Sequence, residues 1–364
     1  MQLTSDRLLL SASDLVGFME CEHLAALDLR VVREIEAIES SRDDAALLVA
    51  RKGDEHERAY LERLCAEGVE VAVVPGAADG LSGLHEAVAR TTEAMRAGAE
   101  VIYQGALLDG DWRGYADFLE RVPAPSPTFG DYSYEVLDTK LARTTRPRFL
   151  AQLCLYSELL ACVQGRWPEW MHVVSGSGER HSFRVDEFSA FFRRLRHRYE
   201  ERLAAAFPET YPQPVAHCEL CRYTDHCQKR WEADDHLSLV AGIGRAQIVR
   251  LAEAGIATCA ELATTALATR PRRIGAGAFE RLREQARLQV HERSTGEQVY
   301  ELQPPEQERG FARLPAPCEG DLFFDMEGDP FYEGEGLEYL FGVTRIEDDA
   351  PAFRAFWAKR DKSH

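Results

Sequence analysis

The sequence has no apolar run of about 18 residues, the length that a helix needs to cross a bilayer. Its first residues, Met1 to Arg7, also lack the charge pattern and the long apolar core of a secretory leader. We therefore expect a protein of the reducing cytoplasm that has no membrane partner.

Positive charge is also scarce in this chain. The 43 lysines and arginines are outnumbered by 61 aspartates and glutamates, so the formal net charge is −18. This balance argues against a protein that coats nucleic acid with a uniformly basic surface. It does not exclude binding in a local basic groove, and the arginine-rich segment from Phe188 to Ala206 is one candidate for such a patch.

The chain has 364 residues, which is too long for one ordinary domain, so two or three domains are expected. Residues 1–232 alternate strand and helix patterns, which predicts an α/β domain. Helical patterns alone follow in residues 233–295. Residues 296–318 are rich in proline and glutamate, which predicts a linker, and residues 319–364 start a further α/β segment.

Alternating apolar and polar residues surround Asp117 and Asp138, and each pattern predicts a half-buried strand. The turn formers between them, Pro123 to Pro127, allow a hairpin that could place the two carboxylates side by side. Asp138 and Lys140 are two residues apart, so they project from the same face. Carboxylates bind Mg²⁺, and a nearby ammonium can orient or deprotonate water. The alternative is a surface ion pair, with Asp117 capping a strand.

Two long helices are predicted on either side of this hairpin. Residues 44–67 carry His56 and an apolar stripe. The stripe comprises Leu47, Leu48, Ala50, Tyr60, Leu61 and Leu64. The second helix starts after Pro147 and runs to Gln164, with Gln152 and Tyr156 on one face. That pair could belong to the site or could be a polar edge on a core helix.

Nine cysteines in a reducing compartment indicate buried, reactive or metal-binding thiols rather than disulfides. Cys218, Cys221 and Cys227 have the spacing Cys-x2-Cys-x5-Cys, which is typical of a metal site. A fourth ligand from His217 or His226 would make a zinc site. Cys21 is predicted on a helix that Ser13 or Asp14 caps. The cysteines predicted as small core residues are Cys65, Cys154, Cys162 and Cys259.

The order of these motifs resembles the PD-(D/E)XK nuclease superfamily, and within it the RecB-like branch that includes CRISPR-associated RecB-like nucleases. The matching motifs, in order, are His56, Gly-x-x-Asp ending at Asp117, Asp-x-Lys at 138–140 and Gln-x-x-x-Tyr at 152–156. The resemblance implies a restriction-endonuclease-like core, which is a mixed sheet flanked by helices. It also implies a metal-dependent DNA nuclease that acts as an exonuclease.

The resemblance assigns a role to each motif. His56, Asp117 and Asp138 would hold Mg²⁺ or Mn²⁺, with a backbone carbonyl from Val136 or Leu137. Lys140 would orient or activate water. Gln152 and Tyr156 would position a DNA strand and the lysine.

The same branch often carries a [4Fe–4S] cluster held by one distant N-terminal cysteine and three C-terminal ones. The resemblance therefore implies that Cys21 joins Cys218, Cys221 and Cys227 around a cluster with a structural role. Zinc, with a histidine as the fourth ligand, remains the alternative at this site.

The resemblance continues toward the end of the chain and covers about residues 8–345. Gly242-Ile243-Gly244 and Gly275-Ala276-Gly277 each precede or start a helical pattern and resemble helix-hairpin-helix motifs, although a spacer or protein-contact module is the alternative. Asp325 and Glu327 resemble the first motif of ribonuclease-H-like exonucleases. We expect that domain to be incomplete at residue 364, and we assign no catalysis to it.

Two hypotheses about the function of the whole chain follow. The first is a nuclease that acts on DNA, with a helicase encoded downstream or in a longer version of the chain as a candidate partner. The rival is a non-catalytic DNA-binding or scaffold protein that keeps the fold and a structural iron–sulfur or zinc site.

Overall fold

The computed structural model describes all residues except 5–6, 41–43, 77–79, 208–209, 303, 330–331, 333–335 and 359–364. The chain divides into two compact units, Met1–Glu297 and Gln298–His364. This division falls inside the segment 296–318 that the sequence predicts as a linker. Each unit is described by itself.

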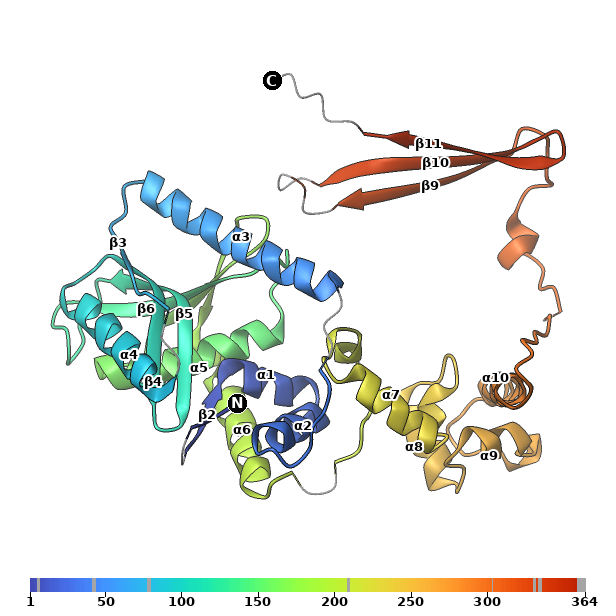
Figure 1. Cartoon of the computed structure of the whole chain (residues 1–364), viewed down its shortest axis with the longest axis horizontal. Helices are drawn as coiled ribbons and strands as arrows, with labels where there is room; N and C mark the ends of the chain where they lie inside the picture. The colour runs from blue at the N-terminus through green and yellow to red at the C-terminus, as the bar shows by residue number, and fades with distance from the viewer. Residues whose placement is uncertain are drawn as a thin grey trace. The chain divides into compact units, whose positions relative to one another are not determined.

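The first unit contains a mixed eight-stranded sheet (Figure 1). Its strands are β1 (Gln2–Thr4), β2 (Arg7–Ser11), β3 (Val71–Val73), β4 (Val101–Asp109), β5 (Trp112–Val122), β6 (Ser133–Thr139), β7 (Trp170–Val174) and β8 (Arg180–Arg184). The longest strand, β5, pairs antiparallel with β4 along one edge and with β6 along the other. The sheet continues from β6 through a parallel pair to β7 and then to β8.

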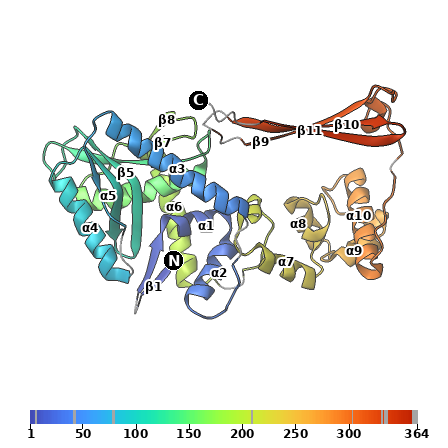
Figure 2. The same ribbon diagram turned by 45° about the horizontal axis from the view of Figure 1, so that its top comes forward.

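Helices cover both faces of this sheet. The helices of this part of the chain are α1 (Ala12–Glu20), α2 (Glu22–Val32), α3 (Asp44–Ala66), α4 (Gly80–Arg96), α5 (Pro147–Gln164), α6 (Val185–Ala204), the 3₁₀ turn η1 (Ala216–Leu220) and α7 (Thr224–Ala233). The main core joins α1, α5 and α6 to one face of the sheet. A smaller core on the other face places Tyr60 and Leu64 of α3 against Phe118 and Leu137, and Figure 2 shows α3 along that face. The predicted α/β class is therefore confirmed.

Local sequence explains why the elements around the site form where they do. All seven residues of β6 are buried, because helices cover both faces of this central strand. Helix α5 starts at Pro147, whose fixed φ suits the first helical position. It ends at Gly165, which adopts the left-handed conformation with φ 70°.

Three predictions about local structure are wrong. Helix α1 ends at Glu20, and Cys21 lies at the junction between α1 and α2 rather than on a helix. The residue that caps α1 is Ser11, whose backbone N–H donates to Asp14 Oδ2 at 2.8 Å. On α3, Leu47 and Leu48 are 52% and 43% exposed, so the apolar stripe faces the sheet only in the C-terminal half of the helix.

The four cysteines predicted as core residues divide evenly. Cys154 and Cys259 are buried, as predicted, but Cys65 and Cys162 are exposed. Cys65 lies near the end of α3, next to the buried Leu64 but on a neighbouring face. Helical periodicity alone does not separate adjacent faces of so polar a helix.

Residues 237–295 add a small helical part with its own core. It contains η2 (Leu237–Leu239), α8 (Arg245–Glu253), α9 (Cys259–Thr264), η3 (Leu267–Thr269) and α10 (Ala276–Thr295). Gly244 and Gly275 are the N-cap residues of α8 and α10, and Gly242 turns the chain with φ 77°. Leu251, Leu262 and Ala286 lie at the centre of the packed cluster.

The second unit contains the 3₁₀ turn η4 (Gly310–Arg313) and an antiparallel sheet of β9 (Leu322–Asp329), β10 (Leu337–Glu347) and β11 (Ala350–Trp357), with β10 in the middle. Apolar side chains on both faces of this sheet are largely exposed, among them Phe323, Phe324 and Trp357. Asp325 and Glu327 are also exposed and share one face. No helix among the described residues of the whole chain is long and apolar enough to span a membrane.

Candidate functional site

The site forms where β5 changes its partner. One edge of β5 pairs with β2 at Trp112 and Arg113, and with β6 only from Phe118 onward. Asp117 lies at the end of the interval between these two pairings. Its Oδ2 accepts hydrogen bonds from the Thr139 backbone N–H at 2.9 Å and from Thr139 Oγ1 at 3.2 Å. The carboxylate thus takes the role of a main-chain acceptor and ties β5 to the end of β6.

The opposite edge of β5 is also irregular at this point. Gln104 of β4 has a left-handed backbone with φ 58° and lies between the paired residues Tyr103 and Gly105. Its side-chain amide donates to Glu57 of α3. A non-glycine residue in this conformation is strained unless its surroundings hold it. Gln104 therefore links Glu57 of α3 to the position on β4 that lies across from Asp117 on β5.

Asp138 is fully buried at the end of β6 and forms an ion pair with Lys140 Nζ. Apart from Lys140 and Asp117, no described residue gives its carboxylate oxygens a hydrogen bond. Burying a carboxylate with so few partners is costly, and a bound cation would compensate for that cost. Because Asp138 is buried, the alternative of a surface ion pair is wrong. The alternative that Asp117 caps a strand is also wrong, because Asp117 lies within β5.

The charges in this site perturb one another. Burial, and then the neighbouring charge of Asp138, raise the pKa of Asp117 well above its ordinary value. Burial alone would lower the pKa of Lys140, but the charges of Asp138 and Asp117 outweigh it and the net shift is upward. One ammonium therefore faces two carboxylates, and the site is suited to an additional cation.

Gln152 and Tyr156 extend the site along α5. Gln152 Nε2 donates to Tyr156 Oη at 3.2 Å, as expected for residues four apart on a helix. The Tyr156 ring packs so closely on Gly114 of β5 that a Cβ there would lie 2.6 Å from two ring carbons. This contact explains why glycine precedes Asp117 by three residues. The pKa of Tyr156 is raised by burial and by the charge of Asp138.

His56 lies on α3, one turn before Tyr60, whose ring centroid is 4.9 Å from that of Phe118. Its Nε2 atom is buried and has no hydrogen-bond partner among the described residues. This environment suits a ligand atom, but no described contact joins His56 to Asp117 or Asp138. Its role as a ligand therefore stays a prediction.

Glu57 is a site residue that the sequence reasoning missed. Its charge acts on both Asp117 and Lys140, and it hydrogen-bonds Gln104. Burial, and then its hydrogen bond to Glu57, raise the pKa of Tyr103 to about 12. The sequence contained one signal: Glu57 is three residues before Tyr60, so it extends the stripe that faces the sheet.

The described residues contain no group of three or more His, Cys, Asp or Glu side chains that could hold a single metal ion. In the carboxylate site, Asp117 and Asp138 supply two carboxylates at one point of the sheet. Mg²⁺ commonly keeps several waters and binds proteins through one or two carboxylates. Two carboxylates beside a lysine therefore satisfy the ordinary requirement for this cation.

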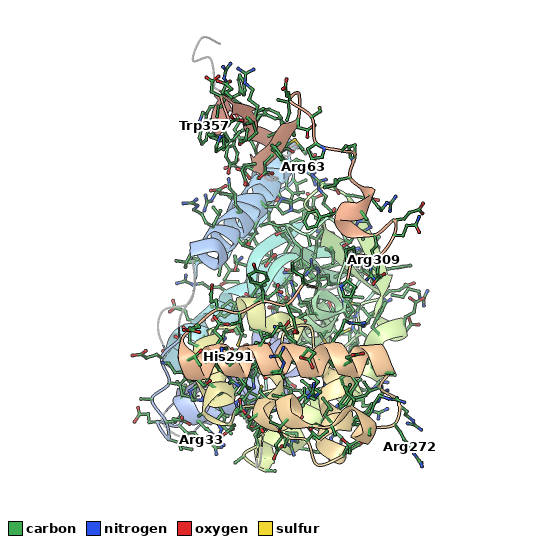
Figure 3. The ribbon with its side chains drawn as sticks, turned by 90° about the vertical axis from the view of Figure 1, so that its right-hand side faces the viewer. Arg33, Arg63, Arg272, His291, Arg309 and Trp357 are labelled. Atoms are coloured by element: carbon green, nitrogen blue, oxygen red, sulfur yellow. The ribbon has the colours of Figure 1, made fainter. Side chains whose placement is uncertain are left out.

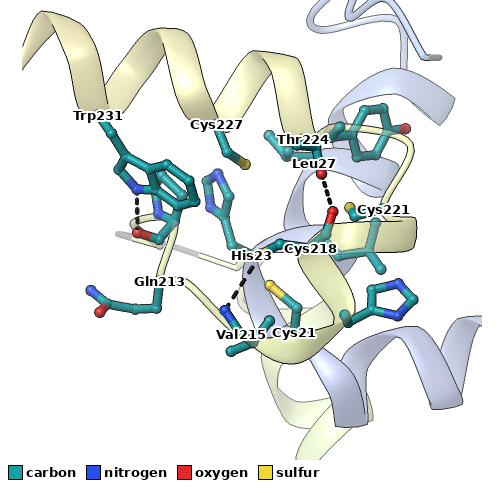
Figure 4. A pocket seen from close by; sticks show the side chains of 14 residues that line it. Cys21, His23, Leu27, Gln213, Val215, Cys218, Cys221, Thr224, Cys227 and Trp231 are labelled. Carbon is teal, nitrogen blue, oxygen red and sulfur yellow. Dashed lines mark hydrogen bonds between the residues drawn. The ribbon is translucent and has the colours of Figure 1, made fainter. Parts of the chain in front are cut away.

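A second site lies between the N-terminal helices and the segment before α7. Cys21, Cys218, Cys221 and Cys227 all line one pocket, shown in Figure 4. Cys21 comes from the α1–α2 junction, so the predicted meeting of two distant parts of the chain is confirmed. Tyr223 joins the same two parts, because its hydroxyl donates to Asp28 Oδ1 of α2 at 2.9 Å.

Burial favours the protonated form of three thiols in this pocket, those of Cys21, Cys221 and Cys227. Burial raises the pKa of Cys21, and burial with the nearby thiols raises the pKa of Cys227 to about 12. Cys218 Sγ accepts a hydrogen bond from the Val215 backbone N–H at 3.4 Å. Metal ligation would remove the thiol protons, and backbone hydrogen bonds to sulfur help to set the potential of iron–sulfur clusters.

Two histidines also line this pocket, His23 and His217. The sequence analysis did not single out His23. Its hydrogen-bond partner is Thr210, whose Oγ1 lies 3.0 Å from His23 Nδ1 although the two residues are far apart in the sequence. Burial, and then Arg30, lower the pKa of His23 to about 4, so its ring is neutral at pH 7. His217 Nδ1 is buried without a partner among the described residues, which keeps the zinc alternative open.

Four thiols line this pocket. Four thiolates are the ligand set of a four-iron cluster, whereas zinc takes thiolates and imidazoles about 2.0 to 2.3 Å from one centre. The pocket contains both kinds of ligand, so both cofactors stay predictions.

No protein-family model matches the chain, and no curated protein matches its sequence. The residues of the two sites therefore carry the evidence for function.

The raised pKa of Asp117 leads to a prediction about stability. A carboxyl with a raised folded-state pKa favours the protonated form, so the metal-free protein should gain stability as pH falls from neutral toward about 4. Asp117→Asn should remove the penalty and raise the melting temperature at pH 7 in EDTA by a few degrees. The measurement is thermal unfolding against pH.

The matched control is Asp131→Asn, which changes an exposed loop carboxylate and should leave the melting temperature unchanged. Added Mg²⁺ should reverse the order by stabilising the wild type more than Asp117→Asn. A loss of stability in metal-free Asp117→Asn at pH 7 would contradict the electrostatic description of the site.

Proposed function

We propose that this chain is a metal-dependent nuclease that hydrolyses phosphodiester bonds in DNA. The main support is the convergence of Asp117, Asp138 and Lys140 at one point of the sheet, where the fully buried Asp138 has no described partners other than Lys140 and Asp117. The order of motifs from His56 to Tyr156 adds the resemblance to PD-(D/E)XK nucleases of the RecB-like branch. Together they favour a restriction-endonuclease-like core over other mixed α/β folds.

Asp117 and Asp138 would hold Mg²⁺ or Mn²⁺, with His56 and a β6 backbone carbonyl as further candidate ligands. When bound, such a cation stabilises negative charge on the phosphate and lowers the pKa of water. Because the pKa of Lys140 is raised, its ammonium is charged at neutral pH. Lys140 is therefore better suited to orienting water and stabilising charge than to accepting a proton.

Gln152 and Tyr156 act as positioning residues in this proposal. Their mutual hydrogen bond fixes the tyrosine hydroxyl, and the packing of the ring on Gly114 fixes the spacing between α5 and β5. The pair thereby keeps the helix in register with Asp117. The same polar pair could contact a DNA strand through its remaining hydrogen-bonding capacity.

Cys21, Cys218, Cys221 and Cys227 would hold a [4Fe–4S] cluster, with zinc as the alternative metal. When bound, the cluster supplies a cross-link between α2 and α7 rather than a catalytic group. None of the described residues that line this pocket forms a hydrogen bond or an ion pair with Asp117 or Asp138. This separation supports a structural role.

The helical part and the second unit fit this proposal as accessory segments. Gly244 and Gly275 cap helices, as expected of helix-hairpin-helix motifs. The Asp325 and Glu327 pair on β9 resembles the start of a ribonuclease-H-like domain. We assign the chemistry to the first unit alone.

The direct test is a cleavage assay on linear single-stranded and double-stranded DNA, using anaerobically purified protein. Cleavage should require Mg²⁺ or Mn²⁺ and stop in EDTA. Tight DNA binding without cleavage under every metal condition would support the rival function, a non-catalytic DNA-binding or scaffold protein.

Lys140→Ala should lower turnover by about 10²- to 10⁴-fold, which is the usual size of such contributions. Its effect on Mg²⁺ affinity should be small, because the lysine is not a ligand. Rates measured across a Mg²⁺ titration separate the two quantities. Lys52→Ala, which removes an ion pair with Glu55 on α3, is the control. Lost metal binding with normal turnover at saturation would refute the proposed role.

A further inference from the structure

About half of the described arginines of the first unit are paired with acidic side chains. Examples from three separate elements are Arg90 with Glu86 at 2.6 Å, Arg180 with Glu120 at 2.7 Å and Arg293 with Asp235 at 2.6 Å. Such pairing is expected in a chain with a net charge of −18. A groove in which arginines without acidic partners gather is therefore informative.

Three unpaired arginines occur together in the helical part. The side chains of Arg245, Arg272 and Arg273 are exposed and have no hydrogen bond or ion pair with any described residue. With Arg250 they line one open groove between α8 and the loop before α10. Figure 3 shows the Arg272 side chain extended from the edge of this part. The groove has four arginines and one acidic residue, Glu253.

The groove is a built feature rather than a chance gathering of side chains. Arg250 Nη1 donates to the Arg273 backbone carbonyl at 2.6 Å, which joins α8 to the loop. Arg273 itself has a left-handed backbone with φ 67°, and Pro271 beside it is buried. This conformation is costly for a non-glycine residue, so the surrounding structure holds it in place.

The chemistry of the groove selects its ligand. Unpaired guanidinium groups held close together repel each other, and several anionic groups at similar spacing would relieve that repulsion. Between the arginines lie Ala246, Ala254 and Val249, which is 48% exposed. Alternating phosphates and less polar sugars match such a surface, and arginine is well suited to phosphate.

We propose that the groove formed by Arg245, Arg250, Arg272 and Arg273 binds the phosphodiester backbone of a nucleic-acid strand. The proposal deepens the function proposed above, because the bound strand would be the nuclease substrate. The Gly242–Gly244 turn is not part of the groove lining. The groove is thus a separate contact from the glycine turn singled out in the sequence.

Of the five arginines on α6 that the sequence suggested as a candidate patch, Arg193 and Arg194 are exposed. The other three are weaker candidates for phosphate contacts, because they have acidic partners. Arg202 pairs with Glu22, and Arg198 lies 3.8 Å from the same carboxylate. Arg196 pairs with Glu158 and Glu200. Because these charges are already neutralised, phosphate contacts gain less there than in the α8 groove.

The test compares two double variants of the full chain that change the net charge equally. Arg245→Ala with Arg272→Ala removes two groove arginines, while Arg90→Ala with Arg287→Ala removes two exposed arginines paired with Glu86 and Glu284. Binding of labelled single-stranded and duplex oligonucleotides is measured by fluorescence anisotropy in EDTA over a range of salt concentrations. Thermal melting checks that both variants fold.

The groove variant should lose two phosphate contacts, so the slope of log affinity against log salt should shrink by about 1.4 for single strands or 1.8 for duplex. The control should keep the wild-type slope. An unchanged slope and affinity in the groove variant would overturn the proposal. The proposal would also be overturned if polyglutamate displaced the labelled oligonucleotide as well as an unlabelled oligonucleotide of the same charge does, because the groove would then bind any polyanion.

A small p-nitrophenyl phosphodiester separates this proposal from the proposed function. The groove variant should hydrolyse it at the wild-type rate, because so small a substrate needs only the carboxylate site. If no form of the protein hydrolyses this substrate or DNA, the nuclease function fails and the anisotropy result alone decides on the groove. A slowed rate in the groove variant would show that its arginines act on the active site and would contradict a pure binding role.

Discussion

Asp138→Asn should abolish metal-dependent cleavage while leaving the fold intact. The substitution preserves the shape of a side chain that is fully buried in β6, but it removes the negative charge that a cation needs. Metal ions contribute several kcal/mol to such reactions, and ~4 kcal/mol corresponds to about a thousandfold in rate. Cleavage rates of purified protein in Mg²⁺ and Mn²⁺ measure the effect.

Asp111→Asn is the matched control for this substitution. Asp111 lies in the turn just before β5 and forms an exposed ion pair with Arg7 at 2.5 Å. The control should cleave at the wild-type rate, and both variants should give wild-type circular dichroism. Metal-dependent activity retained in Asp138→Asn would remove the active-site assignment.

Cys21→Ser should lose the brown colour of an iron–sulfur protein and destabilise the first unit. A covalent link that closes a loop of about a hundred residues is worth ~4 to 5 kcal/mol. The link from Cys21 to Cys218 closes a longer loop, and the lost metal bonds add to the effect. We expect the melting temperature to fall by about 10 °C or more. Visible absorption and thermal unfolding are the two measurements.

Cys65→Ser is the control, because Cys65 is exposed on α3 and lies outside the cysteine pocket. It should change neither colour nor stability. A zinc site predicts a different pattern: colourless protein, metal content unchanged in Cys21→Ser, and metal lost on His217→Ala or His226→Ala. Metal analysis of these variants therefore decides between the two cofactors.

Several parts of the carboxylate site follow from local sequence rules. The two-residue period of a strand predicts that Asp138 and Lys140 share a face, and they form an ion pair. The prolines between Pro123 and Pro127 predict a turn, and β5 pairs antiparallel with β6 as that turn requires. Whether the assembled residues cut DNA stays a prediction.

Other features depend on long-range packing and had no local signal. The left-handed backbone of Gln104 arises in a strand where no glycine marks it. Leu47 and Leu48 continue an apolar stripe in the sequence, yet they are exposed because the core beneath α3 is built around Tyr60 and Leu64. Periodicity predicts which residues share a helix face, but it does not predict how far along the helix the sheet extends.

The position of Cys21 between α1 and α2 affects the order in which parts of the chain can fold during synthesis. Domains generally fold as units during synthesis, beginning from the N-terminus. Here, β2 must wait for β5, and the pocket that Cys21 lines is complete only when Cys227 has been made. Under the proposal of a [4Fe–4S] cluster, the cluster could assemble only after that point. Iron supply at that moment would then influence how much of the newly made protein reaches the mature state.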